Sequence, residues 1–471
     1  MIRNSTRFND EANMTYKYSS AENLLNNEDD LSEFIRHHQT VQRPRLKELR
    51  DYYKGHNRMI LEADTGKRRL EPHLADNRAT HNFAKYVSQF IQGYMMGVPL
   101  KTSYPDESVD EQIRDINRLN DADEHNSEIV LDQSIYGRAY ELVYRNQYDE
   151  VRFTTSDVLE TFVIYDDTVA EKPIAGVRYI YKEFEGKTTV YLYTNDVIRR
   201  YTLNDDIKLE LEEETINYFD GIPIIEYMNN KHRQGDFEDV LTLIDLYDAS
   251  QSDTANYMQD LNDAMLKIVG NLSIDAEEAK RMKENNILML QTEPDASGTR
   301  QQADADYIYK QYDVAGTEAY KDRIFNNILL FTSIPNLLDD TSKGRQSGES
   351  IKMKLFSLSQ KRATKERLFK RSLRDRYRLI NNMLTIASEG TFDVNEISIT
   401  FTENLPSMVS KELEWFGKAG GQLSNKTLLE QLSFIESADE ELELIEEENT
   451  LNREMYNFDV EVDADDADDE E

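Results

Sequence analysis

After a polar start, apolar residues recur at helical spacing in the first hundred residues. Residues 1–30 are rich in Asn, Ser, Asp and Glu, and this composition predicts a mobile N-terminal arm. The pattern turns helical over about residues 30–55. A second helix is predicted over Asn82–Met96, and Gly97 and Pro99 end it. Its apolar face holds Phe83, Val87, Phe90, Ile91 and Tyr94.

The hydrophobic period shifts towards two between about residues 136 and 230. Short segments rich in Tyr, Val, Ile and Thr are separated there by turn residues. They are Tyr140–Tyr144, Glu150–Thr154, Thr161–Tyr165, Gly176–Lys182, Thr188–Tyr193 and Val197–Thr202. The pattern predicts an antiparallel meander within an α+β domain.

A long helix is predicted from Asp236 to Gly270. Its apolar positions at helical spacing are Val240, Leu241, Ile244, Tyr257, Leu261, Met265 and Ile268. Residues 271–313 predict a small separate module of short elements, with a turn at Pro294–Gly298. A further helix over about residues 314–333 ends before Pro335.

The longest predicted helix follows a polar loop at residues 336–348. About 39 residues without Pro or Gly run up to Gly390, which corresponds to a helix about 58 Å long. Its apolar stripe consists of Ile351, Leu355, Leu358, Phe369, Leu373 and Ile380. A short strand over Ile397–Thr402, helical segments over about Ser410–Asn457 and an acidic tail complete the chain.

The composition narrows the class of protein. Of the 471 residues, 39% are hydrophobic and 31% are charged, so many helical faces must be solvated or paired with other subunits. The net charge of −36 argues against tight, non-specific DNA binding, because an acidic surface repels phosphates. The lack of cysteine excludes disulfides, Cys-ligated metals and thiol nucleophiles. No apolar segment is long enough for an export signal or a membrane span.

The motifs of common enzyme classes are missing from the sequence. There is no phosphate-binding loop, since Asp64–Lys67 lacks the upstream glycine. G-x-S-x-G, H-E-x-x-H and G-x-G-x-x-G are absent, and Asp121–Asn126 lacks the glycine of an EF-hand loop. His37 and His38 point to different sides of a helix, which favours surface residues over ligands. The sequence therefore predicts no catalytic residue, no metal site and no cofactor.

Several stretches, in consistent order over about residues 30–400, resemble the portal proteins of long-tailed phages that infect Gram-positive bacteria. Those near the N-terminus are Tyr52–His56, Asn82–Val87 and Gly93–Pro99. Those in mid-chain and beyond are Gly221–Glu226, Asn229–Asn230, Gly235–Glu238, Ile244–Asp248 and Ser347–Phe356. The N-terminal arm and the acidic tail are not covered. The consistent order is far more specific than any one of these stretches.

The resemblance implies an α+β, predominantly helical portal fold, assembled as a ring, usually of twelve subunits, around a central channel. Its regions would be the arm (1–30), wing (31–235), stem helix (236–270), clip (271–313), second stem helix (314–334), channel loop (335–348), long wing helix and short strand (349–402), helical crown (403–458) and acidic disordered tail (459–471).

The resemblance also implies a function and partners. The ring would occupy one vertex of the virion capsid, after assembly in the host cytoplasm, and would serve as the conduit for genome packaging and ejection. Its partners would be other copies of itself, the large terminase subunit, the major capsid and scaffolding proteins, the head-completion adaptor and double-stranded DNA passing without sequence specificity. A separate ATPase would supply the work, so no enzymatic activity and no membrane would be involved.

Two charge patterns suggest candidate site residues. Asp253, Asn256, Asp260 and Asp263 follow at i, i+3, i+7 and i+10 and share a face of the helix predicted from Asp236. In a ring this stripe would give bands of negative charge that discourage sticking of DNA. An ordinary solvated face or an intersubunit salt-bridge surface explains the same pattern, and the sequence leaves the choice open.

The second pattern is a basic stretch, Lys343–Arg378, with 13 basic and 3 acidic residues. Lys343 and Arg345, on the polar loop, are predicted to approach DNA in the channel. The helical cations are predicted to pair with acidic faces of neighbouring subunits. They are Lys361, Arg362, Lys365, Arg367, Lys370, Arg371 and Arg374. The acidic tail is predicted to be solvated, with repulsion of DNA inside the head as the alternative.

Two further classes of protein fit the composition. A carboxylate-dependent metal hydrolase acting on nucleic acid would use the abundant Asp and Glu, but no compact ligand set stands out in the sequence. A scaffold or adaptor binding partners through acidic helices would be a monomer or a small oligomer. The mass of the particle in solution separates the ring from both alternatives.

Overall fold

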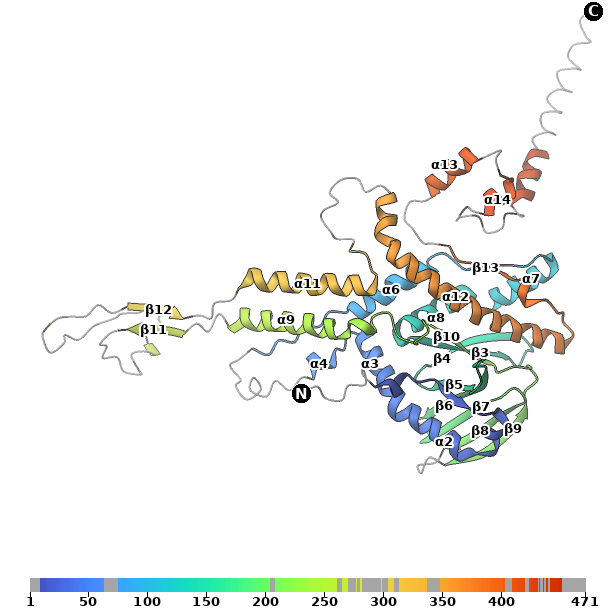
Figure 1. Cartoon of the computed structure of the whole chain (residues 1–471), viewed down its shortest axis with the longest axis horizontal. Helices are drawn as coiled ribbons and strands as arrows, with labels where there is room; N and C mark the ends of the chain where they lie inside the picture. Colours follow the sequence, from blue (N-terminus) through green and yellow to red (C-terminus); the bar gives the residue numbers. More distant parts are fainter. Residues whose placement is uncertain are drawn as a thin grey trace, which may run out of the picture. The chain divides into compact units, whose positions relative to one another are not determined.

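The computed structural model describes residues 9–62, 75–203, 208–260, 265–269, 304–308, 313–336, 348–402, 409–419, 423–430 and 441–450, with isolated positions between them. The described chain is a mixed α/β structure that divides into two units (Figure 1). The first unit consists of residues 1–50, 84–238 and 333–471, and the second of residues 51–83 and 239–332. Each unit therefore combines segments that are far apart in the sequence.

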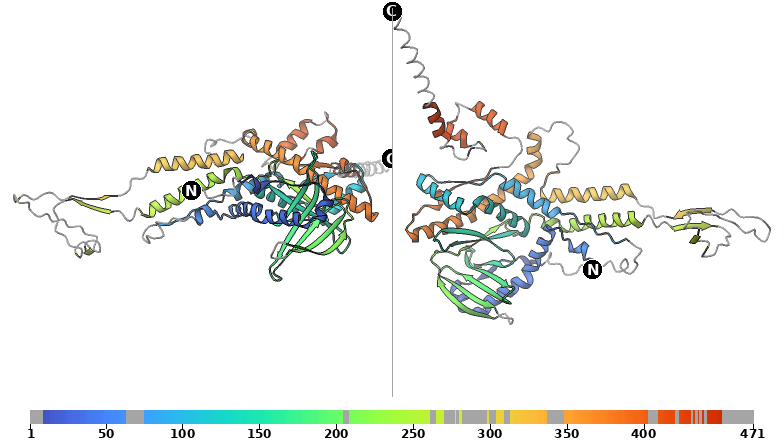
Figure 2. Two further views of the ribbon diagram at one scale, coloured as in Figure 1. Left: turned by 60° about the horizontal axis from the view of Figure 1, so that its bottom comes forward. Right: turned by 180° about the vertical axis from the view of Figure 1, so that it is seen from behind.

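A six-stranded sheet in the first unit contains the last four strands of the predicted meander (Figure 2). Its order is β1 (Tyr16–Tyr18), β5 (Thr161–Asp166), β6 (Pro173–Lys182), β7 (Lys187–Tyr193), β8 (Val197–Leu203) and β9 (Leu209–Ile216). Neighbours from β5 to β9 are antiparallel, whereas β1 adds in parallel to β5. Alternating burial, with Val177 and Tyr179 inward and Arg178 less buried, accounts for the period of two.

The segment predicted to be a mobile arm is largely part of this core. Residues 1–8 lie outside the described residues, but a short helix η2 (Asp10–Asn13), strand β1 and helices α1 (Ala21–Asn26) and α2 (Glu28–His37) follow. Leu24 and Leu31 are buried in one cluster with Phe162 and Val190 of the sheet. The arm prediction is therefore wrong from Asp10 onward, because a few well-spaced apolar residues anchor a segment whose average composition is polar.

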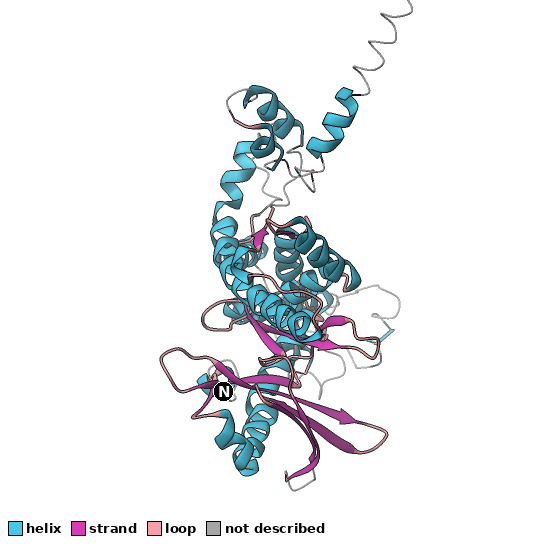
Figure 3. Cartoon of the chain, turned by 90° about the vertical axis from the view of Figure 1, so that its right-hand side faces the viewer, coloured by secondary structure: helices cyan, strands magenta, loops and turns pink. Residues whose placement is uncertain are grey.

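A second sheet of three antiparallel strands also belongs to the first unit (Figure 3). Its order is β10 (Ile224–Met228), β3 (Arg138–Arg145) and β4 (Val151–Ser156), so the first two strands of the predicted meander lie apart from the other four. Helices α8 and α12 pack against it. The remaining elements that precede β3 are η3 (His38–Gln42), α3 (Arg43–Tyr53), α6 (Phe83–Met96), β2 (Lys101–Ser103), α7 (Glu107–Leu119) and α8 (Ala122–Tyr136).

The predicted long helix is present as α12 (Gly348–Ala387), of 40 residues, drawn in orange in Figure 1. Its buried positions include the predicted Leu355, Leu358, Phe369, Leu373 and Ile380. The elements after it are η7 (Val394–Glu396), β13 (Ser398–Thr400), which pairs with β2, then α13 (Val409–Ala419), α14 (Asn425–Glu430) and a helical stretch at residues 441–450. The acidic tail lies outside the described residues.

The second unit centres on two helices that pack together, α9 (Leu241–Asp260) and α11 (Val314–Thr332). It also holds α4 (Arg58–Leu61) and a two-stranded ribbon of β11 (Met265–Val269) and β12 (Asp304–Ile308), and the turn η4 (Glu238–Val240) precedes α9. The helix predicted over 314–333 is confirmed. The helix predicted over 236–270 is wrong at both ends, since α9 covers only Leu241–Asp260. At the C-terminal end Met265–Val269 pairs as a strand, because a short apolar run fits the period of a helix or of a strand.

Candidate functional site

The long helix α12 carries both buried and exposed charged residues. Arg376 is a buried one. Its Nη2 lies 2.7 Å from Oε1 of Glu141 on β3, and Nε donates to Oε2 of Glu141 at 3.0 Å. Both side chains are completely buried. The guanidinium also lies over the ring of Phe153, 4.4 Å from its centroid, and Nη2 donates to Asn126. The pair thus joins α12 to β3 and α8.

Glu141 collects further donors around the same carboxylate. His125 Nε2 lies 2.6 Å from Oε1, and the Tyr227 hydroxyl donates to Oε2 at 2.8 Å. Burial alone would raise the pKa of Glu141, but the Arg376 guanidinium and the His125 hydrogen bond outweigh it and lower the pKa to about 2. A charged carboxylate is therefore stable in the core because every strong neighbour favours the ionised form.

Asp236 forms a second buried site on α12. Its carboxylate lies 2.9 Å from Nζ of Lys361 and 2.5 Å from Nζ of Lys365. The two lysines hold the pKa of Asp236 far below its usual value despite burial, and burial lowers the pKa of Lys365. The segment that leads into η4 is thereby tied to α12. It is held again by Arg45, which forms an ion pair of 2.5 Å with Glu238.

These contacts correct part of the prediction that the helical cations pair with neighbouring subunits. Lys361 and Lys365 contact Asp236 of their own chain, and Arg362 lies 2.5 Å from Glu366. Lys370 lies over the Phe401 ring, 5.5 Å from its centroid. The spacing along the helix shows which cations share a face, but a buried acid more than a hundred residues away decides which face is inside.

The remaining cations form an exposed stripe on α12, here called the arginine face. It consists of Arg367, Arg371, Arg374 and Arg378 at i, i+4, i+7 and i+11. Arg378 pairs with Asp375 at 2.5 Å. Across the part of the chain that the structure describes, Arg367, Arg371 and Arg374 have no ion-pair partner. In a chain of net charge −36, this is a surface with uncompensated positive charge.

The acidic stripe predicted on the first long helix is not one continuous face. Asp253 is exposed, but Asn256 is buried and its Oδ1 accepts a hydrogen bond from the Asn77 backbone N–H at 2.6 Å. Asp260 is the last residue of α9, and Asp263 lies outside the described residues, as do Lys343 and Arg345 of the predicted channel loop.

Asp248 on α9 gathers three hydrogen bonds and was not singled out as a site from the sequence. Its completely buried carboxylate accepts hydrogen bonds from Asn57 Nδ2 at 2.9 Å, from the His81 backbone N–H at 2.8 Å and from His81 Nδ1 at 2.9 Å. Burial raises the pKa of Asp248, against these hydrogen bonds. Together with Asn256, it fixes the stretch 77–81 to α9.

His38 also differs from the prediction of a surface residue. It is buried, and its Nδ1 lies 2.8 Å from the Tyr179 hydroxyl. Burial is the largest cause that lowers the pKa of His38, to about 3, so the ring is neutral near pH 7. His38 is buried because the π-helical turn η3 rotates its side chain towards the sheet.

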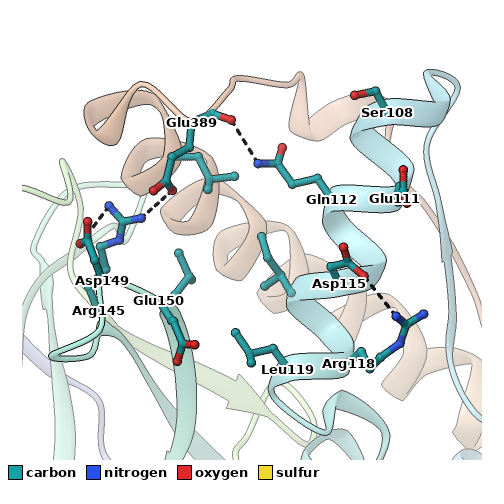
Figure 4. A pocket seen from close by; sticks show the side chains of 13 residues that line it. Ser108, Glu111, Gln112, Asp115, Arg118, Leu119, Arg145, Asp149, Glu150 and Glu389 are labelled. Atoms are coloured by element: carbon teal, nitrogen blue, oxygen red, sulfur yellow. Dashed lines mark hydrogen bonds and ion pairs between the residues drawn. The ribbon is translucent and has the colours of Figure 1, made fainter.

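One cavity of about 830 Å³ lies beside α7 and the end of the β3–β4 hairpin (Figure 4). Arg145 there contacts Glu389 at 2.5 Å and Asp149 at 3.4 Å, and Gln112 donates to the Glu389 carbonyl at 3.2 Å. These are paired surface charges, and no histidine lines the cavity.

No group of three or more His, Asp or Glu side chains in the described part of the chain is placed to hold a metal ion. Likewise, none of its helices is both long enough and apolar enough to cross a membrane.

Comparisons with known proteins give a consistent result. A family described as "Phage portal protein, SPP1 Gp6-like" matches residues 32–454, further towards the C-terminus than the resemblance noted above. The portal protein of Clostridium phage phiCD119 is 23% identical over 440 residues, covering 87% of this chain and 94% of that protein. The portal protein of Bacillus phage SPP1 is 23% identical over 444 residues, covering 88% and 85% respectively.

Among solved structures, a chain from the "Neck of empty GTA particle computed with C6 symmetry" is similar. The TM-score is 0.47 at 12% identity, with 78% of this chain and 92% of that chain covered. A chain from the "Virion of native gene transfer agent (GTA) particle" gives a TM-score of 0.44, also at 12% identity, with 73% and 87% covered.

Proposed function

The chain belongs to the SPP1 Gp6-like family of phage portal proteins, and we propose that it forms a dodecameric ring at one vertex of the capsid. The observation that carries this proposal is the family match over residues 32–454, which covers most of the chain. Double-stranded DNA passes through the channel of this ring during packaging and ejection, without sequence specificity. The ring assembles in the host cytoplasm.

The ring guides DNA passively and performs no catalysis of its own. The work comes from the large terminase subunit, which docks on the clip, and the head-completion adaptor replaces it after packaging. The major capsid and scaffolding proteins surround the ring at the vertex. The absence of enzyme motifs from the sequence supports a structural role, and the net charge of −36 supports a channel from which DNA is released rather than held.

We assign the regions of the proposed ring to the elements that the structure describes. Helices α9 and α11 form the stem, the ribbon β11–β12 belongs to the clip, and the helices from α13 onward form the crown. The two sheets, their covering helices and α12 form the wing. Asp253, the exposed member of the predicted acidic stripe, faces the channel and repels phosphates.

The arginine face of α12 contacts the neighbouring subunit in this ring. Identical copies with a net charge of −36 repel each other, so assembly needs a surface that offsets the repulsion. Arg367, Arg371 and Arg374 are exposed and lack acidic partners among the described residues. An acidic surface of the next copy is the complementary partner that every subunit of a ring can supply.

Lys343 and Arg345, on the loop between α11 and α12, approach DNA in the channel. Reversing both charges is expected to impair packaging or retention of DNA while leaving the ring intact, measured as packaged genome length and as leakage from filled heads. Unchanged packaging and retention in the double variant Lys343→Glu/Arg345→Glu would remove these residues from the proposal.

The mass and shape of the purified protein test the proposed function directly. Light scattering with negative-stain imaging is expected to show a particle of about twelve 55.0 kDa subunits with a central hole. A monomer at all concentrations would contradict the ring and favour an adaptor. Metal-dependent cleavage of DNA by the pure protein, lost when the protein is removed by affinity depletion, would favour a hydrolase.

A further inference from the structure

The hairpin between β6 and β7 carries a fully exposed apolar side chain at its tip. Phe184, at the tip of this hairpin, is fully exposed, with a relative accessibility of 105%. The tip is nevertheless well formed, because the backbone N–H groups of Glu185 and Gly186 both donate to the Lys182 carbonyl. Gly186 supplies the positive φ of +62° that closes the turn. An exposed phenylalanine at the tip of a hydrogen-bonded turn is typical of an anchor residue in an interface.

A pocket that could receive a phenylalanine side chain lies at the opposite end of β6. This cavity of about 840 Å³, here called the β10 pocket, is bounded by the β5–β6 turn, β10 and α12. Its apolar wall includes Val163, Ile174, Ile222, Ile224 and Leu379. Arg371 and Arg374 of the arginine face line it as well, together with Lys172. An aromatic ring could pack on the apolar wall, and a neighbouring carboxylate could pair with the cations.

The charges of the pocket and of the tip are complementary once internal pairs are removed. Among the acids that line the pocket, Glu226 pairs with Arg233, Glu171 with Lys17 and Asp375 with Arg378. Asp166 accepts hydrogen bonds within its own turn. Asp220 also lines the pocket and is exposed, so one further acid stands against three cations. Arg371, Arg374 and Lys172 have no ion-pair partner in the described part of the chain, and neither does Glu183, which precedes Phe184.

The tip cannot reach the pocket of its own chain. Ile174, near the start of β6, lines the pocket, whereas Phe184 lies two residues beyond Lys182, the last residue of this ten-residue strand. At about 3.3 Å per residue the two ends of the strand are about 30 Å apart. A knob at one end of a strand and a pocket at the other give a head-to-tail contact, which closes into a ring when repeated by rotation.

We propose that Phe184 of each subunit inserts into the β10 pocket of the next copy, with Glu183 placed against Arg371 and Arg374. This contact rests on the proposed ring and names one of its interfaces. Phe184 supplies the buried apolar anchor, and the arginines orient the hairpin through charge-assisted hydrogen bonds to Glu183. The contact uses the same two surfaces on every subunit, so each copy both gives a tip and receives one.

Disulfide trapping tests the contact without interference, since the chain has no cysteine of its own. The double variant Phe184→Cys/Ile222→Cys is expected, after oxidation of the assembled ring, to give a ladder of covalent multimers that a reductant removes. A mixture of the two single variants should stop at dimers. In the matched control Tyr148→Cys/Ile222→Cys, the first cysteine is at another exposed tip, of 75% relative accessibility, and no ladder is expected.

Assembly measurements give an independent readout. Phe184→Ala is expected to raise the concentration at half-assembly on the order of tenfold or more, while Phe184→Leu restores most of it. Urea unfolding of the Phe184→Ala subunit should be unchanged, since the side chain is fully exposed. Arg371→Glu and Glu183→Arg should each weaken assembly, and the two together should recover part of it.

The outcomes separate this contact from the ring itself. If rings of the Phe184→Cys/Ile222→Cys variant give no ladder above the Tyr148 control, and rings form normally from Phe184→Ala subunits, the contact is overturned and the ring is left standing. Failure of the double charge swap to recover assembly would remove Glu183 from it. Absence of rings in the wild-type protein would overturn the proposed function, before any variant is considered.

Discussion

Arg376 and Glu141 form a fully buried ion pair that joins the long helix α12 to strand β3, across 235 positions of sequence. Around this pair, Asn126 accepts a hydrogen bond from Arg376, and His125 and Tyr227 lie within hydrogen-bond distance of the Glu141 carboxylate. A buried pair of this kind contributes little net stability compared with apolar residues of the same volume, but breaking it on one side is costly. It therefore specifies where α12 sits on the sheet.

Removing one partner should destabilise the fold strongly. Arg376→Met leaves the Glu141 carboxylate buried without its main cation, and we expect a loss of about 3–5 kcal/mol in the free energy of unfolding. Urea denaturation followed by circular dichroism measures it. Arg374→Met, an exposed position on the same helix, is the matched control and should change the free energy by less than about 0.5 kcal/mol. Equal effects of the two substitutions would contradict the role of the pair.

The same carboxylate predicts how stability depends on pH. Its pKa is lowered to about 2 in the folded chain, whereas an unfolded glutamate titrates near pH 4.3, so the folded state binds fewer protons between these values. The stabilisation from Glu141 is thus complete above about pH 4.3 and is lost as the pH falls towards 2. Denaturation series at pH 5, 4 and 3 should fall less steeply for Glu141→Gln than for the wild type. Parallel curves would argue against a depressed pKa.

The buried Asp236 should contribute strongly to stability. Asp236→Asn leaves Lys361 and Lys365 without their carboxylate, and Lys365 is buried. We expect a loss of about 3 kcal/mol or more in unfolding free energy. The loss should become smaller at high pH, because burial lowers the pKa of Lys365 and it can become neutral there. Asp375→Asn, a change at an exposed ion pair, serves as the control and should be nearly silent.

In the second unit, Asp248 should control the order of the segment before α6. Asp248→Ala removes the acceptor for the His81 backbone N–H and for Asn57. Amide hydrogen exchange of a peptide covering residues 77–83 is expected to become at least about tenfold faster, because each lost buried hydrogen bond costs about 1–3 kcal/mol. Asp253→Ala, on the exposed side of α9, should leave this exchange unchanged.

Leu24 tests whether the N-terminal segment belongs to the core. It is 1% exposed and lies in one cluster with Phe162 and Val190. Leu24→Ala is expected to lower the unfolding free energy by about 2–5 kcal/mol, as for other large-to-small core substitutions. The neighbouring Leu25 is only partly buried, so Leu25→Ala should cost clearly less. A mobile arm would give no effect at either position.

The sequence by itself determined the elements whose pattern is long and regular. The helical stripe from Leu355 to Ile380 predicted α12, and the alternation from Thr161 to Thr202 predicted four adjacent strands. The order of the resembling stretches also identified the family. The secondary structure of long periodic segments is determined locally, because every helical turn or pair of strand residues repeats the same pattern of buried and exposed positions.

The tertiary structure alone decided which charges are inside and where short segments go. Lys365 and Arg371 look alike in sequence, yet one meets Asp236 in the core and the other is exposed, because the acid comes from a distant loop. The run Met265–Val269 fits a helix or a strand until β12 pairs with it. The polar stretch after Asp10 folds because Phe162 and Val190 cover Leu24. In each case the free energy comes from a partner that no local pattern contains.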